Sequence, residues 1–105
     1  MPDNQGTITY HGLVEINKHH DARIKVTVHN KSKDANLHIK DVVGYVQVGK
    51  HRLDQTVDCH KRVEPRKSIH LDLVVHLPEH VRGVSNARIG LIIPNCGHVT
   101  ITGQT

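Results

Sequence analysis

The stretch Arg23-Ile24-Lys25-Val26-Thr27-Val28-His29 decides the fold class, because apolar and polar side chains alternate strictly along it. Successive side chains of a β-strand point to opposite faces, so Ile24, Val26 and Val28 share one face and the polar residues share the other. This pattern predicts an antiparallel strand with one face in a core and the other in solvent.

A second stretch with the same period begins near Ile69 and ends at Pro78, where a missing N–H stops strand pairing. Its apolar residues occupy alternate positions and share one face: Ile69, Leu71, Leu73, Val75 and Leu77. This stretch predicts a second half-buried strand.

Shorter apolar segments predict the remaining strands. Residues 36–48 are expected to form one long strand. Its apolar residues stand at odd-numbered positions in the first part and mainly at even-numbered positions in the second, and a bulge near residues 41–44 would bring both sets to the same face. Gly49-Lys50 then forms a turn into residues 51–53. Cys59 shares a face with its apolar neighbours and is expected to point inward. Further strands are expected at residues 7–16, 87–93 and 98–102.

These segments predict an all-β chain, a two-sheet antiparallel sandwich of seven to eight strands in a single domain that spans residues 1–105. The chain has no Phe, no Trp and only two Tyr, so the core is expected to consist of Val, Ile and Leu. Those side chains suit pleated, half-buried strands.

The turns carry a resemblance. Asn30-Lys-Ser32 follows the first alternating strand, Val63-Glu-Pro65 precedes Ser68 in the pattern "L-x-P-G-x-S" with Arg66 in place of the Gly, and Leu77-Pro78 closes the next strand. Over roughly residues 13–78 the chain resembles immunoglobulin-like and fibronectin type III-like β-sandwiches, including arrestin-type and type 2 late embryogenesis abundant domains. The resemblance implies an immunoglobulin-like fold and an adhesive, scaffolding or docking role.

Composition narrows the classes of function. The formal charge of +4 is modest, and the shortage of aromatic residues disfavours both single-stranded nucleic acid and carbohydrate as ligands. No apolar run is long enough for a membrane span and no signal peptide is recognisable, so a soluble protein in the cytoplasm is favoured. Two separated cysteines favour free thiols over a disulfide.

Metal binding is the alternative function that the sequence leaves open. Cys96-Gly-His98 lies in a predicted turn where both side chains can converge, and the loop pair His19-His20 can add ligands for zinc or copper. The spacing lacks the short paired repeats of a zinc signature, so no resident cofactor is expected.

Eleven histidines suggest a pH-sensitive surface, since imidazole titrates near neutral pH. Four of them stand opposite apolar neighbours in predicted strands and are expected on outer faces: His29, His38, His70 and His76.

Taken together, these features predict a non-catalytic binding or structural module. It is expected to dock a protein partner, or to form a homo-oligomer, through an edge strand or through the loops at one end. No catalytic residues are assigned, because the chain has no nucleophile elbow, P-loop or dinucleotide fingerprint.

Overall fold

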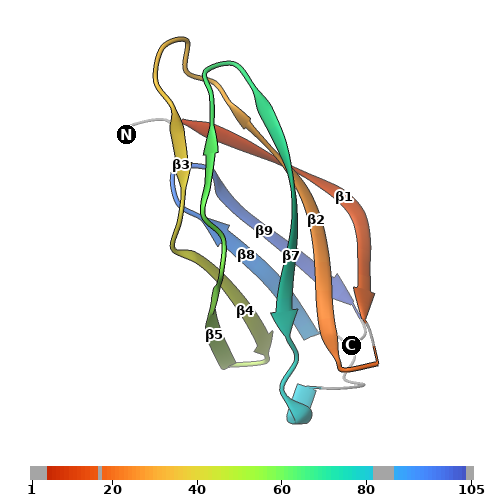
Figure 1. Cartoon of the computed structure of the whole chain (residues 1–105). Coiled ribbons are helices and arrows are strands. Elements are labelled where there is room, and N and C mark those ends of the chain that lie inside the picture. The colour runs from red at the N-terminus through yellow and green to blue at the C-terminus, as the bar shows by residue number, and fades with distance from the viewer. Residues whose placement is uncertain (1–4, 17, 82–86, 104–105) are drawn as a thin grey trace.

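The described strands form three antiparallel sheets where two were expected, and the two larger sheets lie as layers around one core (Figure 1). A computed structural model describes residues 5–16, 18–81 and 87–103. The described strands are β1 Gly6–Ile16, β2 Asp21–Asn30, β3 Leu37–Ile39, β4 Val42–Val48, β5 His51–Val57, β6 Lys61–Val63, β7 Ser68–His76, β8 Ala87–Ile93 and β9 Gly97–Gly103. A short 3₁₀ helix, η1, covers Glu79–Val81. None of the described residues belongs to a helix long and apolar enough to cross a membrane.

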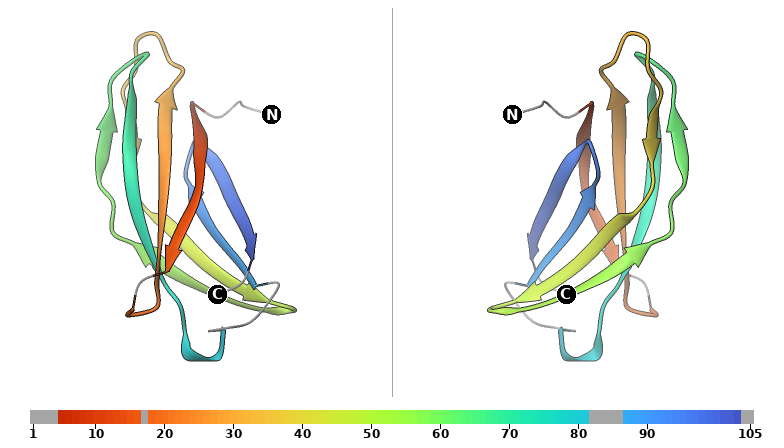
Figure 2. Two further views of the ribbon diagram at one scale, coloured as in Figure 1. Left: turned by 90° about the vertical axis from the view of Figure 1, so that its right-hand side faces the viewer. Right: turned by 90° about the vertical axis from the view of Figure 1, so that its left-hand side faces the viewer.

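All pairings between the described strands are antiparallel, and the prediction of an all-β antiparallel fold is confirmed. Three strands pair in the order β1-β2-β7, four in the order β5-β4-β8-β9, and β3 pairs with β6 alone. Figure 2 shows the two larger sheets as separate layers, with the hairpin of β4 and β5 extending beyond the rest of the molecule.

The alternating strands occupy the positions that the sequence predicts. Burial alternates along β2 and β7, and Ile24 pairs with Leu73 across them. The inner residues of β2 and β7 join those of β4 and β8 in a single cluster that contains neither Phe nor Trp. At Gly44 the two layers approach so closely that a Cβ atom there would lie 2.8 Å from a methyl carbon of Val75.

The structure divides the expected long strand over residues 36–48 into β3 and β4. The break falls at Lys40 and Asp41, where Asp41 has a positive φ of 57°, so the change of apolar phase is accommodated by an interruption between two strands and not by a bulge within one. Opposite it, residues 58–60 interrupt the partner strand between β5 and β6. These two interruptions raise the number of described strands to nine, where seven to eight were expected.

Asn30 ties three segments together at the end of β2. Its side chain is fully buried, and its Nδ2 atom donates hydrogen bonds to the carbonyl oxygens of Ala35 (2.8 Å) and Val63 (2.9 Å). Its Oδ1 atom accepts a hydrogen bond of 3.0 Å from the backbone N–H of Ser32. The Asn30-Lys-Ser32 sequence is therefore a structural turn, as expected.

The turn after β6 has the geometry that its sequence pattern suggests. The backbone N–H of Lys67 bonds the carbonyl of Glu64 at 3.1 Å, and Arg66 has a φ of 63°. Pro in the second position and a positive φ in the third define a type II turn, in which glycine is favoured third. Arg66 thus adopts the left-handed conformation usual for glycine.

Replacement of Asn30 by Ala is expected to lower the free energy of unfolding by about 2–3 kcal/mol, because the carbonyl of Val63 loses its donor in a buried site and that of Ala35 loses one of its two donors. Chemical denaturation measures the loss. The exposed Asn36→Ala serves as the control and should cost less than about 0.5 kcal/mol. Equal stabilities of the two variants would contradict the role of Asn30.

Candidate functional site

The four residues proposed as metal ligands do not come together. Cys96 is buried beside the start of β1, and its Sγ atom lies 2.7 Å from the position that a Cβ on Gly6 would take. His98, in contrast, is exposed on β9. His19 and His20 follow the other end of β1, a strand of 11 residues. At about 3.3 Å per residue, these two pairs stand on the order of 30 Å apart.

Among residues 5–16, 18–81 and 87–103, no group of three or more His, Cys, Asp or Glu side chains is placed to hold a metal ion. Cys96 is buried whereas His98 is exposed, which does not favour the expected convergence of their side chains; metal binding by this pair stays a prediction.

Both thiols are free and buried. Burial raises the pKa of Cys96, and it is also the largest cause of the raised pKa of Cys59. Near Cys59 the charge of Lys61 lowers that pKa and the charge of Asp58 raises it, both by less than burial does. Few thiolates are therefore present at neutral pH, which is typical of structural cysteines.

Three of the four proposed surface histidines share the outer face of the three-stranded sheet. His29 Nδ1 lies 2.8 Å from Ser68 Oγ, His70 Nδ1 lies 2.9 Å from Thr27 Oγ1, and His76 Nδ1 lies 2.7 Å from Asp21 Oδ1. The fourth, His38, is exposed on β3 opposite Arg62. The pH sensitivity of this surface stays a prediction.

His11 belongs to the same face, and sequence reasoning missed it. Its Nε2 atom lies 2.5 Å from Thr27 Oγ1. Thr27 is on the central strand β2, so its hydroxyl group is contacted by His11 from β1 on one side and by His70 from β7 on the other. Their ring centroids are 6.2 Å apart, beside a hollow of about 270 Å³. The polar residues Thr7 and Thr9 stand at alternate positions with His11, and this alternation could have indicated that His11 lies on the outer face.

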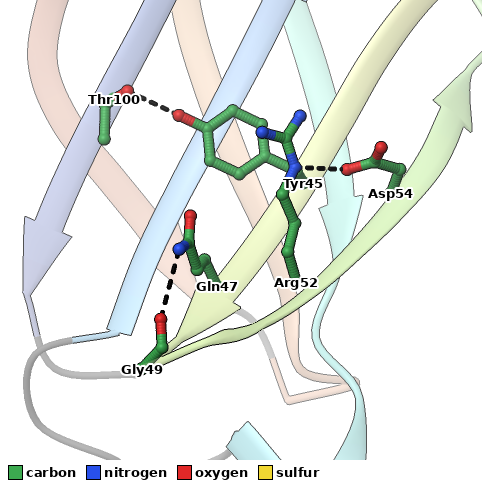
Figure 3. Close-up of polar contacts among 6 residues, drawn as sticks. All are labelled: Tyr45, Gln47, Gly49, Arg52, Asp54 and Thr100. Atoms are coloured by element: carbon green, nitrogen blue, oxygen red, sulfur yellow. Dashed lines mark hydrogen bonds and ion pairs between the residues drawn. The ribbon is translucent and has the colours of Figure 1, made fainter.

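The outer face of the four-stranded sheet centres on Tyr45 (Figure 3). Its ring lies over Gly90 on the neighbouring strand, where any Cβ would overlap it, and this contact leaves Tyr45 only 7% exposed. Its hydroxyl group lies 2.5 Å from Thr100 Oγ1 on β9.

Arg52 continues this arrangement to the sheet edge. Its guanidinium carbon lies 4.2 Å from the centroid of the Tyr45 ring, which is cation–π geometry. Its Nε atom donates a hydrogen bond to Asp54 Oδ1 at 2.7 Å, so two opposite charges stand side by side on β5 (Figure 3). These contacts order the exposed side chains of Arg52 and Asp54.

β5 is an end strand of the four-stranded sheet and lies at the left-hand side of the molecule in Figure 1. Its first four residues are all exposed, in contrast to the alternation along β2 and β7. Leu53 is 46% exposed on the inner side of β5, where it lines a hollow of about 400 Å³ with His51 and His80. No described strand pairs with the outer edge of β5, and the strand also carries exposed apolar surface.

The edges of β1 and β7 are in contact with other parts of the protein. β1 lies against the β8–β9 turn, with the N–H of Gly6 bonding the carbonyl of Asn95 at 2.9 Å. At the edge of β7, the N–H and the carbonyl of His76 each form a hydrogen bond of 2.8 Å with the side-chain amide of Gln55, which lies on β5. β5 begins with four exposed residues, whereas exposed and half-buried residues alternate over residues 97–101 of β9, the other end strand of this sheet. β5 is therefore the more exposed end strand of the four-stranded sheet.

Comparisons with protein-family models, with curated proteins and with solved structures found no match to this chain.

Cys59 and Cys96 are expected to react with a thiol reagent far more slowly in the folded protein than after unfolding. Their raised pKa values favour the protonated form, so the stabilisation from burying neutral thiols is present below pH 9.0, the ordinary thiol value, and is lost as the pH rises further. Alkylation followed by mass spectrometry, with and without denaturant, measures both rates. A thiol that reacts equally fast in the two states would contradict its burial.

Gly90→Ala is expected to displace the Tyr45 ring and to lower the free energy of unfolding by about 1–3 kcal/mol, because the added methyl group occupies the position of the ring. Thermal or chemical denaturation gives the cost. The same substitution in a Tyr45→Ala background is the control and should cost much less. Equal costs in both backgrounds would contradict the contact.

Proposed function

We propose that this chain is an immunoglobulin-like β-sandwich that acts as a non-catalytic module and docks a protein partner by strand addition at β5. The observation that carries the proposal is the open, fully exposed start of β5 with Leu53 beside it. An added strand gains main-chain hydrogen bonds at such an edge, while pockets for alternate side chains give selectivity.

The strand order supports the immunoglobulin-like assignment. If β1, β2, β4, β5, β7, β8 and β9 are lettered A, B, C, C′, E, F and G, the sheets have the orders A-B-E and C′-C-F-G. Immunoglobulin-like domains keep A, B and E on one sheet and C, F and G on the other, and C′ adds to the second. The glycine-like φ of Arg66 supports the same resemblance.

The hairpin turn indicates which backbone groups of β5 are open. Gly49 has a φ of 60° and opens a two-residue turn between Val48 and His51, as in a type II′ hairpin. The residues that flank such a turn form a hydrogen-bonded pair, and bonded and non-bonded pairs alternate from there. Arg52, Asp54 and Thr56 are therefore the residues of β5 whose N–H and carbonyl groups face away from β4.

The hollow beside Leu53 supports the docking of an apolar side chain. It lies on the inner side of β5, so alternate residues of an added strand face it. His51 and His80 border it and can contact polar groups at its rim. The proposed partner is thus an extended segment with an apolar residue that meets Leu53.

Asp54→Pro is expected to abolish strand addition without unfolding the sheet, because proline removes an N–H that faces away from β4. Peptides selected from a displayed library of random linear sequences serve as the probe. Binding should fall at least about tenfold in Asp54→Pro and stay nearly unchanged in Asp54→Ala, which keeps the N–H. Binders that are indifferent to Asp54→Pro would contradict docking at this edge.

A further inference from the structure

The exposed side of β5 is complementary to itself. Arg52 and Asp54 carry opposite charges, project from the same face of the strand and stand on either side of Leu53. An antiparallel copy centred on Leu53 places Arg52 of each chain opposite Asp54 of the other. We propose that the strand docked at β5 is the β5 strand of a second copy of this chain, an inference that rests on the proposed function.

The backbone favours the same register. Arg52 and Asp54 both turn their N–H and carbonyl groups toward the open edge, so they can form hydrogen-bonded pairs across a two-fold axis at Leu53. Two such pairs contribute four main-chain hydrogen bonds between the chains. The four-stranded sheets of the two copies then join into one continuous sheet.

Neighbouring registers are disfavoured by charge. A shift that centres the axis on Asp54 sets two carboxylates directly opposite each other, and a shift that centres it on Arg52 does the same with two guanidinium groups. Like charges directly opposite each other destabilise an antiparallel pair, whereas opposite charges stabilise it. The register centred on Arg52 sets Asp54 opposite Lys50, which lies in the turn outside β5, so among these three arrangements the one centred on Leu53 alone joins opposite charges between residues of β5.

The side chains are already held in suitable positions. Arg52 uses Nε for Asp54 of its own chain, and its guanidinium group has further N–H groups that can reach the partner's carboxylate. Stacking on Tyr45 restrains the arginine before association and so lowers the entropy lost on binding. On the inner side, Leu53 of each chain meets its counterpart and covers apolar surface that is 46% exposed in the monomer.

A single pair of strands makes a small interface, so association is expected in the weak range of transient complexes. Analytical ultracentrifugation from low to near-millimolar concentration should show a reversible dimer of the full chain. A protein that stays monomeric across this range would overturn the inference.

Charge exchange tests the register. Arg52→Asp and Asp54→Arg are each expected to weaken the dimer at least about tenfold, because each sets like charges opposite each other twice. An equimolar mixture of the two variants should form a heterodimer, since both cross-chain pairs then have opposite charges. Recovery in the mixture also shows that both variants are folded. A mixture no tighter than either variant alone would overturn the register.

Disulfide trapping gives an independent readout. With cysteine at position 53, two copies meet at the axis with Cα atoms within disulfide range. Leu53→Cys should therefore cross-link at least about tenfold faster under mild oxidation than Val74→Cys, which places cysteine at an equally exposed site on β7. Equal rates would overturn the inference.

The two proposals fail in different ways. Monomeric protein that still binds selected peptides in a manner sensitive to Asp54→Pro would overturn self-pairing and leave strand docking intact. Insensitivity of both peptide binding and dimer formation to Asp54→Pro would overturn the docking edge itself.

Discussion

Packing of the inner faces of β2 and β7 against those of β4 and β8 is the interaction on which the rest of the structure depends. The inner residues of these strands are mainly β-branched or leucine residues at alternate positions, and the chain has no Phe or Trp to fill a gap. With such side chains the layers must approach closely, as the contact between Gly44 and Val75 indicates. The strict period of two also fixes which residues of each strand face outward.

The positions of the sheet edges depend on where the chain departs from this period of two. Between β3 and β4, and again between β5 and β6, the chain breaks its period, and the long hairpin divides into two separately paired halves. One half carries β5 to the side of the four-stranded sheet, where no described strand pairs with its outer edge. Arg52 and Asp54 are ordered there by Tyr45, whose position depends in turn on the missing side chain of Gly90.

Much of the fold could be predicted because its strongest signals are local. Alternation defines β2 and β7, and the change of apolar phase before Val42 marks the interruption at Asp41. Features that depend on cross-strand register could not be predicted in this way. The placement of Tyr45 over Gly90 joins residues that are 45 positions apart in the chain, and no local period indicates it.

The candidate sites show the same limit. Proximity of Cys96 and His98 in the sequence favours convergence, but Cys96 is buried in the turn before β9 whereas His98 is exposed on that strand. The direction of β1 carries His19 and His20 to the far end of the layer. The shared face of His29, His70 and His76 follows from their strand parity, whereas the contact of His11 with Thr27 depends on pairing between β1 and β2.

The central claim is that β5 presents an open, self-complementary edge, and amide hydrogen exchange measured by NMR at two protein concentrations tests it most directly. The amides of Leu53 and Gln55 should be protected at both concentrations, and that of Thr56 at neither, because Thr56 lies beyond the paired segment. The amides of Arg52 and Asp54 should exchange rapidly in dilute protein and gain protection in concentrated protein. Protection at Arg52 and Asp54 that does not change with concentration, or equal protection of all five amides, would contradict the account.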